Sequence, residues 1–538
     1  MELVQVTDFS FSYGQSSKNA LDSVGFTVCA GEFVLLCGAS GSSKSTLLAN
    51  LKPELSPTGG RKGSICFAGT DIKDLDALQS ACDIGFVMQD VESQLVTDTV
   101  RAELCFGLES LGFPSEIIRR RVAEMASFFG LGRLLDQKVH TLSSGQKQTV
   151  NLASVLALSP RLLLLDEPTS QLDPVASRDF LSMLLRLNHE LGITIIVAEH
   201  NTEALFSLCS RVMVMDNGKL RFDGGSRDCA AWMARQGEPF AALLPAAARI
   251  FNKEEPIPLT VAEGRALFED RLKGKQPALP QPQEQAPQKD IAVRAKGVAF
   301  GYHAIQQPIF RGLEFAAYRH EITAVMGDNG SGKTTLLKLL CGLLKPVRGK
   351  VTVYPKGQGT KAAYLPANTK LLFVRDTVRE DLLDVAGANG NEDAGQRVVA
   401  EAQALGITHI LDCHPYDISA GERQRAAFAK VLLACPDVVL LDEPTKALDP
   451  TAKQQLAAVL KQLTQQGVTV IMASHDTTFC AQYCDRCVLL FDGVVACAAP
   501  PRTFFGGNAF YTTPASLIAS GYRHHAVTCE EVRGLWKE

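Results

Sequence analysis

Two glycine-rich loops, at 38–46 (GASGSSKST) and 327–335 (GDNGSGKTT), hold the residues best suited to phosphate chemistry. A loop of the form G-x-x-x-x-G-K-[ST] between a strand and a helix surrounds phosphate with backbone N–H groups, its lysine reaches the β- and γ-phosphates, and its hydroxyl binds Mg²⁺. The second loop matches this form throughout. The first has Ser43 in the place of Gly332, so its Cβ either crowds the phosphates or opposes the backbone conformation that glycine allows. The loops predict two nucleotide sites.

An acidic strand end follows each loop. Asp166-Glu167 and Asp442-Glu443 each come directly after an apolar run that predicts a buried strand. In enzymes with this kind of loop the aspartate holds Mg²⁺, and we assign that role to both aspartates. The glutamates that follow are placed to polarise an attacking water. The competing interpretation is that the paired carboxylates only cap a turn ahead of the next proline.

These motifs belong to one internal repeat. A short Ser-x-Gly-x motif occurs at 143–146 and again at 419–422, and in both copies its glycine precedes the aspartate of the acidic strand by 21 residues. The loop lysine precedes that aspartate by 122 residues in the first copy and by 109 in the second. Motifs repeated in the same order indicate two domains of one kind.

Composition gives the class of protein. The 538 residues are 46% apolar and 21% charged, as in globular proteins, and 54 basic against 58 acidic residues give a net charge of −4, which disfavours nucleic acid as a main partner. We find no apolar run that could span a membrane and no export signal at the first residues. The 15 cysteines predict reduced, buried thiols in a cytoplasmic protein.

A local change in composition sets the domain boundaries. The stretch at 277–288 (PALPQPQEQAPQ) is rich in Pro and Gln, which is typical of an extended linker. We expect a first domain at 1–225 with a C-terminal extension at 226–276, a linker at 277–290, a second domain at 291–499 and a tail at 500–538.

Apolar runs predict how the elements alternate. Strands are expected at 32–37, 161–165 and 194–198, a helix at 45–51 after the first loop, and an amphipathic helix at 115–131. Unbroken apolar runs suit strands that are buried on both faces of a parallel sheet. The predicted fold class is therefore α/β, once in each copy.

With these motifs in this order, the chain resembles the ATPase subunits of ABC transporters over nearly all of its length outside the linker. The resemblance implies two P-loop NTPase domains in tandem, each with a mainly parallel sheet, flanking helices and a helical subdomain. It implies that the Ser-x-Gly-x motifs form the signature that closes over the nucleotide of the opposite domain. It also implies that His200 and His475 contact the γ-phosphate, and that Tyr13 and Tyr302 support the adenine ring.

The residues assigned to the sites fall into three groups. The catalytic residues are Glu167, His200, Glu443 and His475. The ATP-binding residues are Tyr13, Gly38, Gly41, Ser43, Lys44, Ser45, Thr46, Gln89, Ser143, Ser144, Gly145, Gln146, Tyr302, Gly327, Asn329, Gly330, Gly332, Lys333, Thr334, Thr335, Ser419, Ala420, Gly421 and Glu422. The Mg²⁺ residues are Ser45, Gln89, Asp166, Thr334 and Asp442, and the family's D-loop aspartate is matched by Asp173 and Asp449.

The segment 87–111 (VMQDVESQLVTDTVRAELCFGLESL) narrows the resemblance to the ATPases of energy-coupling factor (ECF) transporters. Gln89 and Gln94 fit the Gln-Asn-Pro-Asp-x-Gln pattern of that group, whereas 90–92 (DVE) depart from it. The tail at 504–532 is similar to that of fused, two-domain members. The resemblance implies ATP- and Mg²⁺-dependent uptake of a vitamin or metal ion. The protein would be peripheral on the cytoplasmic face of the cell membrane, with a transmembrane coupling subunit and a small substrate-binding membrane subunit as partners.

Two other classes stay open, namely sugar-importer ATPases and soluble ribosome-associated translation factors with tandem ABC domains. The translation factors usually carry a long charged linker, unlike this one, and the sugar importers fit the region of Gln94 less well. Cys480, Cys484 and Cys487 have the spacing of an iron–sulfur motif, but they fall where the fold requires a helix and a strand. We therefore favour buried thiols over an iron–sulfur cluster or zinc.

We expect the two domains to pair head to tail within the chain, so that each ATP lies between one loop and the opposite signature. Each site departs from the family pattern at one position. The first has Ser43 in its phosphate loop, and the second has Ala367 where the family's Q-loop has a glutamine, the residue matched by Gln89 in the first. The first site should bind nucleotide more weakly, and the second should couple less well to the membrane partner, because alanine offers neither an oxygen ligand nor a donor. The competing interpretation is a relaxed backbone at Ser43 and two sites that behave alike.

Overall fold

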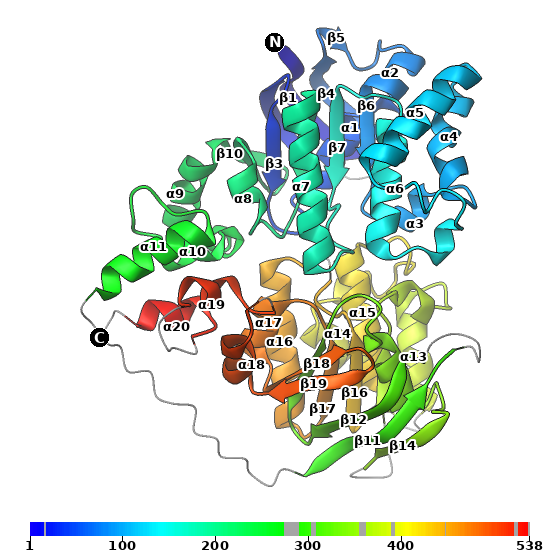
Figure 1. Cartoon of the computed structure of the whole chain (residues 1–538), viewed down its shortest axis with the longest axis vertical. Helices are drawn as coiled ribbons and strands as arrows, with labels where there is room; N and C mark the ends of the chain where they lie inside the picture. The colour runs from blue at the N-terminus through cyan, green and yellow to red at the C-terminus, as the bar shows by residue number, and fades with distance from the viewer. Residues whose placement is uncertain are drawn as a thin grey trace. The chain divides into compact units, whose positions relative to one another are not determined.

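The chain divides into two compact units, Met1–Gly264 and Arg265–Glu538, each of which contains one copy of the motifs (Figure 1). The computed structural model describes residues 1–14, 18–273, 290–302, 308–354, 362–388, 393–446, 448–509, 511–520 and 526–535. The predicted linker at 277–290 lies outside the described residues except for its last position.

The first unit is built on a six-stranded sheet of order β10-β9-β3-β8-β7-β6, in which only β10 runs antiparallel to its neighbour. A second, antiparallel sheet has the order β2-β1-β4-β5. The strands are β1 (Glu2–Tyr13), β2 (Leu21–Cys29), β3 (Phe33–Cys37), β4 (Gly59–Phe67), β5 (Thr70–Asp71), β6 (Ile84–Val87), β7 (Leu162–Asp166), β8 (Thr194–Ala198), β9 (Arg211–Asp216) and β10 (Lys219–Gly225).

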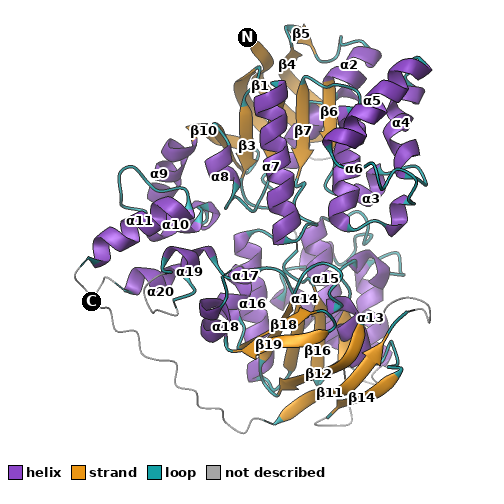
Figure 2. Ribbon diagram, in the orientation of Figure 1, coloured by secondary structure: helices purple, strands orange, loops and turns teal. Residues whose placement is uncertain are grey.

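Helices pack on both faces of this sheet, whereas the helices that follow β10 lie to one side of it (Figure 2). The helices are α1 (Lys44–Asn50), α2 (Ala77–Asp83), α3 (Val91–Gln94), α4 (Val100–Ser110), α5 (Ser115–Phe128), α6 (Ser144–Leu156), α7 (Pro174–Leu191), α8 (Leu205–Leu208), α9 (Ser226–Gln236), α10 (Ala246–Ile250) and α11 (Val261–Leu272), the last of which contains the boundary between the units. Successive strand residues point to opposite faces of a sheet. Leu35 and Ile195 accordingly lie in one hydrophobic core, and Leu36 and Ile196 lie in another.

The second unit repeats this architecture, with a six-stranded sheet of order β15-β16-β17-β13-β18-β19 and an antiparallel sheet of order β12-β11-β14. Its strands are β11 (Ile291–Phe300), β12 (Phe310–Tyr318), β13 (Ile322–Met326), β14 (Arg348–Val353), β15 (Ala362–Leu365), β16 (Val438–Asp442), β17 (Thr469–Ala473), β18 (Arg486–Phe491) and β19 (Val494–Ala499). Its helices are α12 (Lys333–Leu340), α13 (Val378–Ala388), α14 (Ala394–Ala404), α15 (Ala420–Leu433), α16 (Pro450–Gln465), α17 (Thr477–Tyr483), α18 (Pro501–Gly507), α19 (Pro514–Ile518) and α20 (Cys529–Gly534). The predicted α/β class is confirmed in both units.

The predicted helical subdomain is present in each unit. In the first, α4 packs against α5 and α6, and in the second, α13 packs against α14 and α15. The amphipathic helix expected at 115–131 ends earlier, at Phe128. Gly130 adopts a left-handed φ of 66°, and the N–H of Leu131 returns to the carbonyl of Ala126 at 2.8 Å, which closes the helix end.

The segment after each domain core is also repeated. Arg227 pairs with Glu263 at 2.6 Å, and Glu263 accepts the backbone N–H of Leu259 at 2.8 Å. In the second unit Arg502 pairs with Glu531 at 2.7 Å, and Glu531 accepts the N–H of Val527 at 2.8 Å. The same ion pair and the same backbone bond therefore fasten the two ends of each C-terminal segment to one another.

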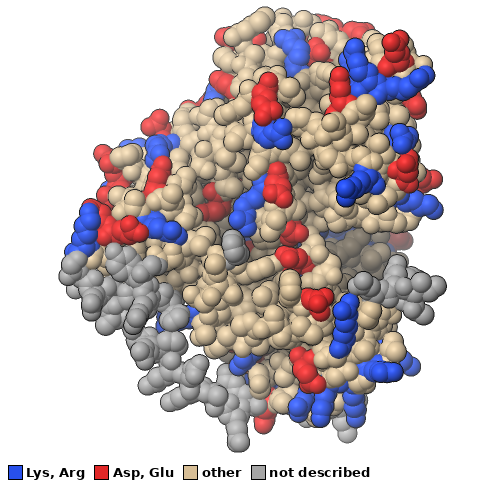
Figure 3. All heavy atoms as spheres, viewed as in Figure 1, with Lys and Arg blue, Asp and Glu red and all other residues tan. Residues whose placement is uncertain are grey.

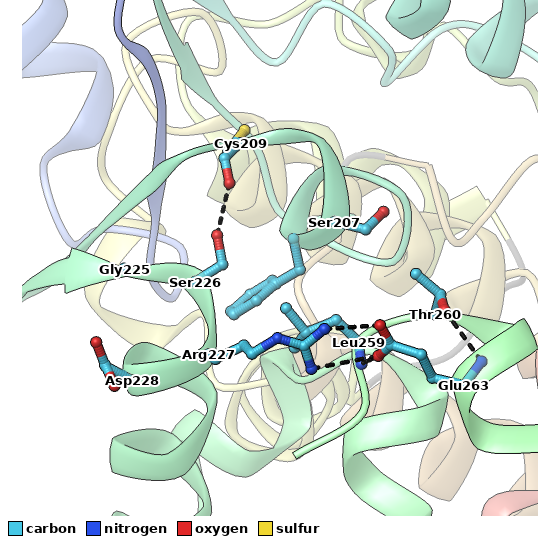
Figure 4. A pocket seen from close by; sticks show the side chains of 10 residues that line it. Ser207, Cys209, Gly225, Ser226, Arg227, Asp228, Leu259, Thr260 and Glu263 are labelled. Atoms are coloured by element: carbon cyan, nitrogen blue, oxygen red, sulfur yellow. Dashed lines mark hydrogen bonds and ion pairs between the residues drawn. The ribbon is translucent and has the colours of Figure 1, made fainter. Parts of the chain in front are cut away.

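A pocket of about 390 Å³ lies beside this fastening in the first unit (Figure 4). The Arg227–Glu263 pair lines it, and the hydroxyl of Ser226 donates to the Cys209 carbonyl at 2.6 Å. On the face drawn in Figure 3, acidic and basic side chains are interspersed, as the small net charge would suggest. Among the helices in the described ranges, none combines the length and the apolar character that a membrane crossing requires.

Candidate functional site

The two phosphate loops connect the central strand of each sheet to the next helix, β3 to α1 and β13 to α12. The Lys44 ammonium donates to the carbonyls of Gly38 at 2.9 Å and Ala39 at 3.0 Å, and Lys333 donates to those of Gly327 at 2.8 Å and Asp328 at 3.0 Å. Both lysines are buried. Each loop therefore curves around a positive charge at the N-terminal end of a helix, an arrangement that suits an anion.

Ser43 keeps the backbone conformation of a glycine. Its φ is 73°, and that of Gly332 is 100°, both in the left-handed region. A Cβ at Gly332 would lie 2.9 Å from ring atoms of Phe310. At the register position of Phe310, the first unit has the smaller side chain of Leu21. The expected conflict with the backbone is thus present, at a cost of roughly 1–2 kcal/mol, but the backbone does not relax away from it.

A hydroxyl and a carboxylate meet at the end of each acidic strand. The Ser45 hydroxyl donates to Asp166 Oδ1 at 3.0 Å, and the Thr334 hydroxyl donates to Asp442 Oδ2 at 2.8 Å. Burial raises the pKa of Asp166 to about 6 and also raises the pKa of Asp442. Hydroxyl and carboxylate oxygens are the ligands that Mg²⁺ prefers, so these residues fit that ion.

The two glutamates that follow are held in an unusual backbone conformation. Glu167 has φ 44° and Glu443 has φ 50°, and their N–H groups bond the carbonyls of Ala198 and Ala473, both at 2.9 Å. Left-handed backbone at a non-glycine residue costs energy and often occurs at functional sites, where the surrounding structure maintains it. The same outlier at the same position in both units indicates that each glutamate is directed by the neighbouring strand.

The polar partners of the two glutamates differ. Glu167 accepts the Gln89 side-chain amide at 2.6 Å and lies 2.7 Å from His200 Nε2. Glu443 lies 2.9 Å from His475 Nδ1. The structure therefore brings together the predicted glutamine, glutamate and histidine of the first unit, and the predicted glutamate and histidine of the second.

The second unit has a hydroxyl donor at the end of its acidic strand that the sequence interpretation missed. Ala367 stands in the position of Gln89, and the neighbouring Asn368 caps a short turn by accepting the N–H of Lys370 at 3.1 Å. Tyr364 instead donates its hydroxyl to Asp442 Oδ2 at 3.0 Å. The sequence signal for this contact was a tyrosine in the strand that leads into the Q-loop, next to the acidic strand.

The two predicted adenine platforms lie beside their phosphate loops. The Tyr13 hydroxyl is 2.9 Å from that of Thr46, and the Tyr302 hydroxyl is 3.2 Å from that of Thr335. Tyr13 is 46% exposed and Tyr302 is 50% exposed, so each ring has a face open to a ligand. Their contact with adenine stays a prediction.

The signature residues form helix starts. Ser143 caps α6 and Ser419 caps α15, each in a capping box with the fourth residue of its motif, Gln146 or Glu422. This reciprocal bonding gives a physical reason for the Gln or Glu at that position. The predicted D-loop aspartates, Asp173 and Asp449, likewise cap α7 and α16.

Two further residues at the sites were missed. Glu199, directly before His200, is buried and accepts the N–H of Thr169 at 2.8 Å and its hydroxyl at 2.6 Å. In the second unit, the Tyr511 hydroxyl from the C-terminal tail donates to the side chain of Asp328 in the phosphate loop. The composition of the sequence gives no signal for the second contact, since it joins segments 183 residues apart.

The cysteine motif lies inside the second unit. Cys480, Cys484 and Cys487 are buried in the hydrophobic core around α17 and β18, and burial raises the pKa of the Cys487 thiol. Within the described part of the chain, no group of three or more His, Cys, Asp and Glu residues could hold a metal ion.

Comparison with known proteins matches one family to two separate segments of the chain. The family described as ABC transporter matches residues 21–170 and 310–446. A Bacillus anthracis protein, named as a candidate ABC transporter ATP-binding protein, is 39% identical over 98% of this chain and 97% of its own. YkoD of Bacillus subtilis, named as a candidate HMP/thiamine import ATP-binding protein, is 30% identical over 99% of this chain and 98% of its own.

A solved structure extends the likeness across both units. Described as a model of ribosome-bound archaeal Pelota and ABCE1, it covers 93% of this chain and 80% of its own, with a TM-score of 0.63 and 20% identity. At that identity the likeness speaks for the fold alone.

Proposed function

Because this chain belongs to the ABC transporter family, we propose that it is the ATP-hydrolysing subunit of an ECF-type importer that takes up a vitamin or a metal ion. The chain is an ATPase with two ATP-binding domains in tandem. The observation that carries the catalytic assignment is the cluster of Glu167, Gln89 and His200 beside the Ser45–Asp166 pair. The importer assignment is supported by the likeness to a protein named for HMP/thiamine import.

The geometry around Gln94 supports the ECF subtype. Gln94 donates to the Phe86 carbonyl at 2.7 Å and accepts the N–H of Met88 at 2.8 Å and the Asn151 amide at 2.9 Å. This side chain therefore ties the Q-loop to β6 and α6. The glutamine of the ECF pattern thus has a structural reason for its place, five residues after Gln89.

In the proposed mechanism, Lys44 and Lys333 bind the phosphates of ATP from the centres of their loops. Mg²⁺, when bound by the Ser45–Asp166 and Thr334–Asp442 pairs, supplies positive charge that offsets the charge of the phosphates. Glu167 orients the attacking water and accepts its proton, and Gln89 and His200 hold that carboxylate from two sides. Catalysis is then mainly positioning and electrostatic stabilisation.

We further propose that the two domains pair head to tail. The signature at 143–145 would complete the second ATP site, and that at 419–421 the first. ATP would close the pair, and hydrolysis with loss of phosphate would reopen it. A serine at the start of a helix, already fixed by a capping box, is suited to contact a γ-phosphate through the helix N-terminus.

The proposed membrane partners would dock next to the Q-loops. Val96 is 65% exposed shortly after Gln89, and Leu371 and Val374 are 73% and 79% exposed shortly after Ala367. Apolar side chains exposed in one short segment commonly mark an interaction surface. The transmembrane coupling subunit would bind there, the small substrate-binding subunit would provide specificity, and this chain would be peripheral at the cytoplasmic face.

Replacing both glutamates, Glu167→Gln and Glu443→Gln, tests the catalytic assignment. We expect ATP hydrolysis to fall by about 10²–10³-fold, since each site loses its general base, whereas ATP binding is kept. Hydrolysis and equilibrium binding are measured on the same preparations. Hydrolysis at the wild-type rate in the double variant would show that the base lies elsewhere.

Pull-down from detergent-solubilised membranes tests the transporter assignment. We expect a multi-span subunit and a small membrane subunit to co-purify, and the ligand of the latter identifies the transported substrate. Alanine at Val374 should weaken this capture, and alanine at exposed Val175, on α7, is the matched control. Recovery of ribosomes, or of soluble proteins only, would contradict the proposal and favour a translation factor.

A further inference from the structure

The second ATP site contains a hydroxyl donor that the first does not. Asp442 Oδ2 accepts two hydroxyls, that of Thr334 at 2.8 Å and that of Tyr364 at 3.0 Å. Tyr364 lies in β15, the strand directly beside the acidic strand β16, and is half-buried. Two donors on one oxygen fix the plane of the carboxylate and leave its other oxygen directed away from them.

The corresponding position in the first unit has no such donor. Phe86 pairs with β7 as Tyr364 pairs with β16, and it has no hydroxyl. There the Q-loop supplies Gln89, whose amide bonds Glu167 at 2.6 Å. The second Q-loop has Ala367, whose side chain has no polar atom. The unit without the glutamine is therefore the unit with the tyrosine.

We propose that Tyr364 is a positioning residue of the second ATP site, which holds the Asp442 carboxylate in the orientation that binds Mg²⁺ and so replaces part of the role of the missing glutamine. This inference rests on the proposed metal role of Asp442. Tyr364 acts through that carboxylate and does not itself contact the nucleotide. The second site thereby keeps tight Mg²⁺-ATP binding although its Q-loop has no metal-facing side chain.

The variant Tyr364→Phe tests the proposal, and Phe86 shows that the fold accepts phenylalanine at this position. The full-length chain carries Lys44→Ala as well, so that a fluorescent ATP analogue reports the second site only. We expect the Mg²⁺ concentration for half-maximal binding to rise about tenfold, because a hydrogen bond to a charged group is lost. Affinity for the analogue in EDTA should stay unchanged.

Two outcomes would overturn the proposal. An unchanged Mg²⁺ midpoint would mean that the hydroxyl does nothing for the ion, and an equal loss of affinity with and without Mg²⁺ would mean that Tyr364 only supports the fold. Adding Ala367→Gln to Tyr364→Phe should restore part of the Mg²⁺ dependence if the two side chains serve one role.

A mirror variant keeps the test decisive if Tyr364→Phe is poorly folded. With Lys333→Ala as background, Phe86→Tyr adds the donor to the first site, and we expect its Mg²⁺ midpoint to fall severalfold; no shift would contradict the proposal. Asp442→Asn is the control for the underlying assignment. If Asp442→Asn left the Mg²⁺ dependence intact, the metal role of Asp442 itself would be wrong, independently of Tyr364.

Discussion

At the scale of single residues, the two sites differ most in the side chains that surround their matching motif residues. Ser43 has the left-handed backbone that Gly332 has in the second loop, and Glu167 has a glutamine partner that Glu443 does not have among the described residues. The motif letters alone mark Ser43 as a defect. The left-handed φ and the lysine bonds that both loops share show that the first loop keeps the conformation of the intact loop, with a local energetic cost.

The first prediction concerns this loop position. Ser43→Gly should stabilise the first unit by about 0.5–1 kcal/mol, since relief of the left-handed conformation is partly offset by the greater freedom of glycine in the unfolded chain. Gly332→Ser should cost more than 2 kcal/mol, because its Cβ would lie 2.9 Å from the Phe310 ring. Thermal unfolding measures both.

A repacked variant is the control for this prediction. Adding Phe310→Leu to Gly332→Ser introduces the side chain that the first unit has at this register position and should recover part of the loss. Equal effects of Ser43→Gly and Gly332→Ser, in size and sign, would contradict the role of the neighbouring side chain.

The second prediction concerns Glu199, where burial raises the pKa from 4.5 to about 7. The folded chain therefore holds this proton more tightly than the unfolded chain, and stability falls as pH rises between these values, by about 3 kcal/mol in total. Glu199→Gln should remove only its own share of the slope, because burial also raises the pKa of Glu203 to about 7, and the variant should be relatively more stable above about pH 7. Unfolding in urea across that range measures it.

Glu124→Gln is the matched control, because Glu124 is an exposed carboxyl on α5 of the same unit. It should leave the pH dependence as in the wild type. A slope as steep in Glu199→Gln as in the wild type would assign the whole titration to other groups, such as Glu203.

At the scale of elements, strand ends and helix starts place the chemistry. Asp166 and Asp442 end β7 and β16, and the loop lysines begin α1 and α12. The C-terminal segments repeat as well, and each is fastened by a glutamate that caps a helix start and pairs with an arginine. The segment of the first unit also contacts the loop after His200, where Glu203 accepts the N–H of Ala246 at 2.9 Å.

The third prediction ranks the two parts of this fastening. Glu531→Ala removes the acceptor of the Val527 N–H as well as the ion pair, and we expect a loss of about 1–2 kcal/mol in the local stability of α20. Arg502→Ala removes only a half-exposed ion pair and should cost less than about 1 kcal/mol. Hydrogen exchange at residues 526–535 reports both, and the reverse order would contradict the capping role.

At the scale of the whole molecule, one chain carries two unequal sites. The first has a strained loop and the Q-loop glutamine Gln89, and the second has an intact loop, Ala367 in place of that glutamine and a tyrosine hydroxyl on Asp442. These differences favour unequal roles for the two ATP molecules in one cycle.

The fourth prediction follows from this asymmetry. Lys44→Ala leaves only the second site competent, and Lys333→Ala leaves only the first site, with its strained loop. We expect the Lys44→Ala variant to bind ATP severalfold more tightly than the Lys333→Ala variant. Equilibrium binding and steady-state hydrolysis of the two variants measure the difference. Equal residual affinities together with equal losses of hydrolysis would show that the sites are equivalent.

The sequence by itself determined the repeat, the α/β class, both phosphate loops and the acidic strand ends, because these depend on local spacing and on continuous apolar runs. It also predicted the glutamates and histidines that the structure brings together, since the carboxyl ends of neighbouring parallel strands meet at one edge of a sheet.

Only the tertiary structure decided which side chains complete the sites. Tyr364 reaches Asp442 from 78 residues away, and Tyr511 reaches Asp328 from 183 residues away. These contacts arise from strand order and from the packing of distant segments, neither of which leaves a periodic signal in the chain.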